Sequence, residues 1–433
     1  MELKMGTFPV KRLIFADRTS YTNGLLQINK QELIAEARKD PLVKKADIQL
    51  AMPGEPVRIW PVRDVIEPRV KVRGSGQCYP AICGRSIEPI GEGITHRLSG
   101  IGVVEVSNVP WHDAGGDYVD VFVDMCGPWA RAIPHLSSLK NICVIVEPDE
   151  TIDVHDQNQV VHGACLRVSD HIAATTMDLV PAKYKTYRIS NYDPDLPTVM
   201  YIQCLHSPEG KSGSTKAFCT SIYGYTELQP PWYLHPNEIL DGAITGPYRT
   251  VFNVSWTLQN NPLLLELYRR HGNDFNFKGV ITLRTEWTSQ KEKKIIADQT
   301  AKMAKAMGAN GVVMTWDAGG NEFMEVLRTL QACERLGIKT VLIAAEDTPS
   351  DNLFPLLEPA EEADALISPG FVYSQDMNIG TLPIVDEVIG NSERFQGHWD
   401  LKQETVATSS NNLILPRWYN DHLGMMKYSC DDY

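Results

Sequence analysis

The pattern of apolar and polar positions changes character along the chain. Before residue 150, short apolar runs such as IGVVEV (101–106), VDVFVDM (119–125) and NICVIVE (141–147) are separated by Gly, Pro and Asp. This pattern is typical of strands joined by turns. The run from 48 to 72 has strand-like stretches broken by prolines, which favours edge strands because proline donates no ladder hydrogen bond. The pattern predicts a β-rich N-terminal domain over 1–150.

The C-terminal part alternates between short, uniformly apolar runs and amphipathic segments. Strands are predicted at 279–284, 311–316, 339–345 and 363–368, and helices at 262–272, 290–308 and 322–337. Such alternation indicates a parallel sheet that helices cover on both faces. Glycines after the helices, at 272, 308 and 337, suit the left-handed conformation of a helix end.

We therefore expect an α/β protein in which the β-rich domain precedes a C-terminal parallel-sheet domain of flavodoxin/Rossmann-like type. A mixed segment over 151–261 lies between them and lines a cleft, with a helix over 160–180 and a strand over 198–205. The parallel α/β domain with a C-terminal tail spans 262–433.

Composition and charge exclude several classes. The net charge of −13 argues against a nucleic-acid partner, which requires clustered Lys and Arg. No apolar run reaches the roughly 18–20 residues that span a bilayer. The N-terminus, MELKMGTFPVKRLIF, is too charged for a signal peptide, so we expect a cytoplasmic protein. The 9 cysteines are odd in number and scattered, which argues against a disulfide framework.

The ends of the predicted parallel strands supply one set of candidates, because ligands bind outside the carboxyl ends of such strands. The candidate substrate-binding residues are Arg284, Glu286, Trp316, Asp317, Gly319, Gly320, Asn321 and Glu346. The glycines of WDAGGNE come at the start of a predicted helix, whose first backbone N–H groups can face an anion. The acidic residues of the set, Glu286, Asp317 and Glu346, could instead bind a divalent cation. The alternative is that Asp317 caps a turn and the glycines only relieve steric conflict. Neither a GxGxxG nor a Walker motif is present.

A second set of candidates lies in WHDAGGDYVDVFVDMCGP, residues 111–128. His112, Asp113 and Asp117 could ligate a metal or transfer protons. Cys126 could serve as a nucleophile if its thiol pKa were lowered. The alternatives are a polar turn for the acids and a buried small apolar residue for the cysteine.

His96, in ITHRLSG, is a further catalytic candidate, although it could equally hold two strands together.

Several longer stretches carry a resemblance to a known family. They are INKQELIAEARKD, PGEPVRIWPVRDVIEPRVKV, DMCGP, EILDGAITG, QNNPLLLELYRRHG with NFKGVI, and AKAMGANGVVM with GIKTVLI. Over nearly its whole length the chain resembles the precursor of the α and β subunits of protein B of the glycine, sarcosine and betaine reductases. In that family the precursor is cleaved at a cysteine shortly before the QNNP segment, and the cysteine becomes a pyruvoyl group. The resemblance implies that this group condenses with the substrate amine, and that a selenocysteine- or cysteine-containing partner then attacks the activated carbon.

The chain departs from the family at the cleavage position. It has no cysteine between Cys219 and Cys333. Thr250 and Ser255 remain as oxygen nucleophiles, but neither has the family's local context. We therefore expect an uncut chain without a pyruvoyl group.

Three functions stay open at this point. The first is a subunit of a reductase-like system that binds a small amino- or ammonium-carboxylate for C–N bond cleavage with a thiol or selenol partner subunit, in an oligomer. The second is a self-sufficient metal-dependent or acid/base lyase or hydrolase that acts on a C–N or C–S bond. The third is a non-catalytic binding or assembly protein. For a quaternary amine, Trp232, Tyr233, Trp256 and Trp316 could form a cation–π cage.

Overall fold

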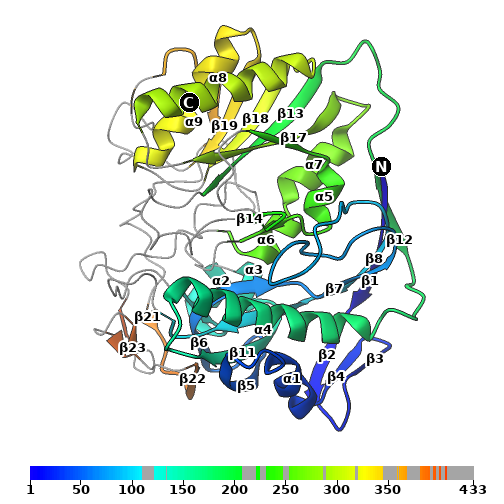
Figure 1. Ribbon diagram of the computed structural model, residues 1–433, viewed down its shortest axis with the longest axis vertical. Helices are drawn as coiled ribbons and strands as arrows, with labels where there is room; N and C mark the ends of the chain where they lie inside the picture. Colours follow the sequence, from blue (N-terminus) through cyan, green and yellow to red (C-terminus); the bar gives the residue numbers. More distant parts are fainter. Residues whose placement is uncertain are drawn as a thin grey trace.

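The computed structural model shows a mixed α/β protein with several sheets (Figure 1). The residues that it describes are 1–109, 121–132, 134–206, 221–224, 231–246, 253–285, 289–316, 320–344, 358, 360–367, 381–390, 394–395, 399–400 and 405–406. The expected α/β class is confirmed in this general form. Among these residues, no helix has the length and apolarity that crossing a membrane requires.

The N-terminal half contains three sheets. The first has the order β12-β1-β8-β7, formed by Tyr184–Arg188, Glu2–Pro9, Gly93–Ser99 and Arg69–Arg73. The second has the order β10-β6-β9-β11-β5, formed by Val121–Asp124, Val57–Ile66, Ile101–Val106, Lys140–Pro148 and Val43–Ala51. The third, β2-β4-β3, is formed by Arg12–Phe15, Leu25–Ile28 and Ser20–Thr22.

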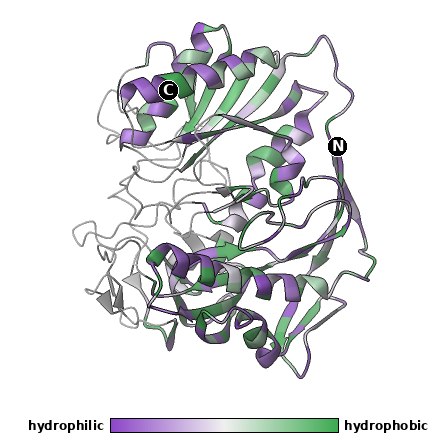
Figure 2. Cartoon of the chain, in the orientation of Figure 1, coloured by the Kyte–Doolittle hydropathy of each residue, from purple (hydrophilic) through white to green (hydrophobic). Residues whose placement is uncertain are grey.

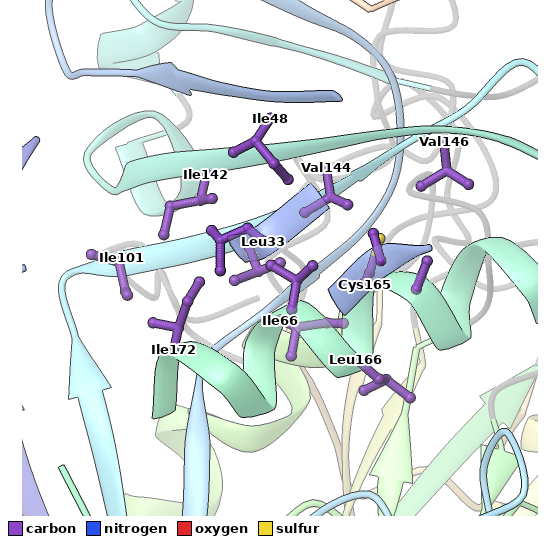
Figure 3. Packing of buried hydrophobic residues seen from close by; sticks show 14 of the residues in the cluster. Leu33, Ile48, Ile66, Ile101, Ile142, Val144, Val146, Cys165, Leu166 and Ile172 are labelled. Carbon is purple, nitrogen blue, oxygen red and sulfur yellow. The ribbon is translucent and has the colours of Figure 1, made fainter. Parts of the chain in front are cut away.

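Two helices cover the second sheet and enclose the main N-terminal core. α4 (Val154–Ala174) packs against α1 (Lys30–Ala37) and against β11. Figure 3 shows side chains from the helices and strands meeting in this core, among them Leu33, Ile66 and Ile172. The helix begins before the predicted residue 160 because the Asp153 side chain caps it by accepting a hydrogen bond from Asp156 N.

The C-terminal half is built on a six-stranded sheet with the order β15-β17-β13-β18-β19-β20. Its strands are Trp232–Leu234, Asn276–Thr285, Thr198–His206, Gly311–Trp316, Lys339–Ala344 and Ala365–Ile367. All neighbouring pairs are parallel except β15 with β17. The strands appear as largely apolar ribbons in Figure 2, as expected for a sheet that is buried on both faces.

Different helices cover the two faces of this sheet. On one face, α8 (Gln290–Ala306) and α9 (Phe323–Arg335) pack on Met200, Ile202 and Met314. On the other face, α5 (Pro236–Leu240) and α7 (Pro262–Arg270) pack on Tyr201 and Val280. The remaining short elements are α2 (Gly127–Ala132), α3 (Pro134–Ser137), β14 (Ser221–Ile222), β16 (Ile244–Thr245), α6 (Ser255–Gln259), η2 (Gly320–Glu322), β21 (Thr381–Leu382), β22 (Glu387–Ile389), β23 (Arg394–Phe395), β24 (Trp399–Asp400) and β25 (Thr405–Val406).

One strand differs from its prediction. The prolines between 48 and 72 favour edge strands, but β6 lies inside its sheet, between β10 and β9. Pro61 is tolerated because the pairing of β6 with β10 is irregular between Ile59 and Val62, so the missing N–H falls where the ladder is interrupted.

The C-terminal chain also returns to this strand. β22 pairs with residues 57–59 of β6, and a Cβ atom added to Gly390 would lie 1.7 Å from the Trp60 carbonyl oxygen. Only glycine fits there, at φ +134.

The expected domain limits at 150 and 261 stay an interpretation. α4 and β12 share a core and a sheet with residues before 150, and β13 belongs to the C-terminal sheet.

Candidate functional site

The order of the C-terminal strands creates a switch point at β13. After β13 the chain passes to α5 and α7 on one face of the sheet, whereas the chain after β17 and β18 passes to α8 and α9 on the other face. Connections that leave adjacent strands toward opposite faces open a crevice outside the carboxyl ends of those strands. This is the default place for a ligand in an open α/β sheet.

Four polar side chains lie on the face of the sheet that α7 covers, near these carboxyl ends. We call Tyr201, Gln203, Arg284 and Thr315 the strand-end face. All four are buried, with exposed fractions of 0–2%. The Tyr201 and Thr315 hydroxyls are 2.7 Å apart. The buried Gln203 Oε1 has no hydrogen-bond partner among the described residues, and an orphaned acceptor of this kind calls for a water or a ligand.

The junction between α6 and α7 borders the strand-end face. It consists of Gln259, Asn260 and Asn261, the QNN of the QNNP segment. Asn261 caps α7 by accepting a hydrogen bond from Leu264 N at 3.1 Å, and Pro262 follows as the first residue of the helix. Its Nδ2 also donates to Tyr201 Oη at 3.4 Å.

Asn260 ties the same junction to the N-terminal half. Its Oδ1 accepts from Arg97 Nη1 at 2.8 Å and from Arg69 Nη2 at 3.3 Å. Arg69 is fully buried and forms an ion pair with Glu67 at 2.6 Å. The α6–α7 junction therefore connects the first N-terminal sheet with the strand-end face.

A buried carboxylate holds the start of α6. Asp64 Oδ2 accepts from Ser255 Oγ at 2.6 Å, and Oδ1 accepts from Ser255 N at 2.8 Å. Ser255 Oγ in turn accepts from Gly246 N at 2.9 Å. Asp64 and Ser255 are both completely buried, and burial raises the pKa of Asp64 to about 6.

Further ionisable groups lie beside Asp64. Glu105 is its cross-strand neighbour on β9, and Glu105 Oε2 lies 2.9 Å from His162 Nδ1 of α4. Both side chains are completely buried. Sequence reasoning missed this cluster, although an aspartate inside the apolar run RIWPVRDVI is a signal that a buried partner exists.

Cys126 follows the end of β10 and is half-buried. Burial, followed by the nearby Asp124 carboxylate, raises the pKa of the Cys126 thiol. Asp124 is bonded to Arg58 Nε at 3.2 Å, and burial raises the pKa of Asp124 to about 6. The lowered pKa that would make Cys126 a ready nucleophile is thus not found.

His96 lies on β8 in the first sheet, among structural contacts. Its Nδ1 is 2.8 Å from Thr176 O, and its ring packs against Phe8 with centroids 4.9 Å apart. Burial lowers the pKa of His96, so the ring is neutral at pH 7. Its catalytic role stays a prediction, and these contacts offer it no support.

The remaining strand-end candidates are not all on one face. Trp316 is fully buried in the cluster under α8 and α9, on the face opposite the strand-end face. Gly320 and Asn321 form the short turn before α9, where Asn321 is exposed. Seven candidates lie outside the described residues: His112, Asp113, Asp117, Glu286, Asp317, Gly319 and Glu346.

The four aromatic residues suggested for a cation–π cage are not gathered. Trp232 packs with the cluster around α5 and α7, and Tyr233 and Trp316 pack with the cluster around α8 and α9. Trp256 packs against the second sheet of the N-terminal half. Over the ranges that the structure describes, no group of three His, Cys, Asp or Glu residues is arranged to hold a metal ion.

Comparisons with known proteins agree over most of the chain. The family model for glycine/sarcosine/betaine reductase component B subunits matches residues 1–410. The chain is 34% identical to sarcosine reductase complex component B subunit alpha of Peptoclostridium acidaminophilum, with 90% of this chain and 89% of the relative covered. It is 33% identical to glycine reductase complex component B subunits alpha and beta of Acetoanaerobium sticklandii, with the same coverage.

A betaine-specific relative is also similar. The chain is 30% identical to betaine reductase complex component B subunit alpha of Peptoclostridium acidaminophilum, with 92% of this chain and 94% of the relative covered. No solved structure is significantly similar to the chain.

Proposed function

Because the chain belongs to the family of glycine/sarcosine/betaine reductase component B subunits, we propose that it is the substrate-binding subunit of a reductase-like system. Its substrate is a small amino- or ammonium-carboxylate. The C–N bond of this substrate is cleaved with the help of a partner subunit, which carries a reactive thiol or selenol. The observation that carries this proposal is the family match over residues 1–410, which includes both large sheets and the α6–α7 junction. The proposed location, the cytoplasm, rests on the sequence alone.

Within this proposal, Arg284 binds the substrate carboxylate. It lies next to the last residue of β17, at the carboxyl end of a parallel strand, with an exposed fraction of 2%. A guanidinium matches the geometry of a carboxylate, and its attraction is strong where water is excluded. The Gln203 amide and the Tyr201 hydroxyl lie on the same face and supply further hydrogen-bonding groups.

The ammonium end of the substrate requires acidic or aromatic groups. Glu286, Asp317 and Glu346 follow β17, β18 and β19 in the sequence and remain the proposed carboxylates for this role. β17 and β18 flank β13 in the sheet, and ligands of open α/β sheets bind outside the carboxyl ends of such strands.

We propose further that the chain stays uncut. The family's pyruvoyl group forms from a cysteine, and between Cys219 and Cys333 this chain has none, so its residues do not fit that group. The Ser255 hydroxyl donates to Asp64 and accepts from Gly246, which supports a structural role for it. A single chain of 48.4 kDa in denaturing mass spectrometry is expected, and fragments that separate near Ser255 would refute this part of the proposal.

Binding is tested by titrating the purified protein with glycine, sarcosine and glycine betaine in a calorimeter. Arg284→Gln is expected to raise the Kd of the bound compound roughly 10- to 150-fold, the effect of losing a hydrogen bond to a charged group. Arg335→Gln is the control, because it makes the same change of side chain at an exposed position. Arg335 is the last residue of α9, at the end of the helix that lies away from the carboxyl end of β18. Unchanged affinity in a folded Arg284→Gln variant would refute the assignment.

The partner is tested by native mass spectrometry of the protein from its own host. A second, different subunit is expected in the complex. A homo-oligomer with stoichiometric divalent metal would instead favour the self-sufficient enzyme, with His112, Asp113 and Asp117 as ligands.

A further inference from the structure

We propose that Gln203 selects the substrate by its amine. Its Oε1 atom accepts a hydrogen bond from an N–H group of the ligand, so amines with at least one N–H bind tightly and quaternary amines bind weakly. This assignment rests on the proposed function, because it concerns the site in which Arg284 binds the substrate carboxylate. It narrows the substrate class to amino acids whose nitrogen carries at most two methyl groups, and it makes glycine betaine a poor ligand.

Gln203 is a polar residue in the middle of a buried sheet. It lies on β13, which the sheet places between β17 and β18. Its exposed fraction is 2%, and its Oε1 has no hydrogen-bond partner among the described residues. A buried acceptor without a partner destabilises the folded protein. The fold itself therefore gives no reason for a glutamine at this position, whereas a ligand that donates a hydrogen bond does.

The cross-strand neighbours of Gln203 do not supply the missing donor. Gln203 pairs with Thr282 of β17 on one side and with Thr315 of β18 on the other. The Thr282 hydroxyl donates to Trp232 O at 3.0 Å, and the Thr315 hydroxyl lies 2.7 Å from Tyr201 Oη. Both hydroxyls are thus engaged, and Gln203 is the side chain of this row that stays available to a ligand.

Arg284 lies further toward the carboxyl ends of the same strands. It pairs with Leu205, two residues after Gln203, so the Arg284 and Gln203 side chains lie on one face of the sheet. With a rise of about 3.3 Å per residue and strands about 4.8 Å apart, the two Cα atoms are roughly 8 Å from each other. A ligand that bridges the guanidinium and the amide is then short, as is a compound with one carbon atom between its amine and its carboxylate.

The two side chains divide the hydrogen bonds of such a ligand between them. The Arg284 guanidinium only donates, which suits a carboxylate. A protonated amine also only donates, so it needs an acceptor, and Oε1 is the acceptor that Gln203 offers. A quaternary amine has no N–H group. Its methyl groups would leave Oε1 without a partner and exclude water from it, which is how a site built for an N–H rejects an analogue that lacks one.

The first experiment compares N,N-dimethylglycine with glycine betaine in a calorimeter at pH 7. The two compounds carry the same charges and differ by one methyl group in place of one N–H. The unaltered protein is expected to bind N,N-dimethylglycine roughly 10- to 150-fold more tightly, the range for a hydrogen bond to a charged group. Gln203→Met replaces the amide by an apolar group of similar size, so it should weaken binding of N,N-dimethylglycine by this factor and leave the Kd of betaine nearly unchanged.

Gln203→Met separates hydrogen bonding from size. A preference for N,N-dimethylglycine that persists in this variant would mean that the third methyl group is excluded by its bulk, and would overturn the proposal. Thr282→Val is the matched control, because it removes a hydroxyl from the same row of the sheet, but one that is bonded to Trp232 O. It should keep the preference of the unaltered protein. An equal loss of preference in Thr282→Val would overturn the assignment to Gln203.

The second experiment needs no ligand and tests whether the amide serves the fold. The Tm of Gln203→Met without ligand is expected to equal or exceed that of the unaltered protein, because the change removes a buried acceptor without a partner. The Tm of Thr282→Val should fall, since Trp232 O loses its donor. A Tm of Gln203→Met lowered as much as that of Thr282→Val would show that the fold holds the amide, and would overturn the proposal.

The binding results also separate this inference from the proposed function. Equal affinities of the unaltered protein for N,N-dimethylglycine and betaine would overturn the inference and leave the proposed function standing. If glycine, sarcosine, N,N-dimethylglycine and betaine all fail to bind at pH 7, the proposed function is refuted and the inference falls with it.

Discussion

Replacing Asp241 with alanine should destabilise the contact between the first sheet and α5. Asp241 follows α5 and is completely buried. Its carboxylate accepts hydrogen bonds from Thr95 Oγ1 at 2.6 Å, from Gly91 N at 2.8 Å and from the Lys71 ammonium. The Lys71 side chain is only 5% exposed, so Asp241→Ala would leave a buried cation without its counter-ion.

The size of the effect follows from this burial. Removing one member of a buried ion pair costs about 3–5 kcal/mol, a large share of the total stability of roughly 5–15 kcal/mol. Replacing both members by apolar residues, in Asp241→Leu/Lys71→Met, should recover most of the loss because no charge remains buried. Glu147→Ala breaks the exposed pair with Lys45, whose side chains are 47% and 75% exposed, and should cost about 0–1 kcal/mol.

The assay is equilibrium urea unfolding, together with native-state hydrogen exchange at Gly91 N. The local measurement is needed because a chain of 433 residues need not unfold in a single step. A loss below about 1 kcal/mol in Asp241→Ala would refute the reasoning. A double variant as unstable as Asp241→Ala would show that the hydrogen bonds, rather than the buried charge, carry the effect.

Three further predictions concern other sites. Gly390→Ala should lower the Tm strongly, because its Cβ would lie 1.7 Å from Trp60 O. Gly54→Ala should lower the Tm only slightly, because Gly54 also has a positive φ but its Cβ would meet nothing within 4 Å. Equal Tm values for the two variants would contradict the steric argument. Between pH 4 and 6 the folded protein keeps a proton on Asp64 that the unfolded chain has lost. The free energy of unfolding should therefore fall as the pH rises, by on the order of 3 kcal/mol from this group. If urea unfolding at a series of pH values shows the same pH dependence in Asp64→Asn, Asp64 is not its source. Cys126 should react slowly with iodoacetamide at pH 7, since its pKa is raised, and a rate above that of a free thiol would show that the thiolate is stabilised.

The C-terminal elements could be predicted because their signals are local. β17, β18 and β19 are apolar runs bounded by polar residues. α8 begins directly after Ser289, which forms a capping box with Glu292, so the whole signal lies within four residues of the sequence. The interior position of β6 could not be predicted, since the tolerance for Pro61 depends on an irregularity in its pairing with β10.

The candidate site could be predicted only in part, for a related reason. Arg284 and Asn261 follow from rules about strand ends and helix caps, which need only neighbouring residues. The bond between Asp64 and Ser255 joins positions 191 residues apart, and no local pattern encodes such a distance. An aspartate in an apolar strand indicates that a partner exists without indicating which residue it is.

The pairing of β22 with β6 has a consequence for the synthesis of the chain. Ile389, the last residue of β22, follows Ile66, the last residue of β6, by 323 residues. At about 5–20 residues per second, a ribosome needs roughly 16–65 s to add them. During that interval residues 57–59 of β6 lack the neighbour that they have in the finished protein. An unpaired strand edge can recruit a strand from another chain, so the nascent protein should depend on chaperones most until β22 has been made.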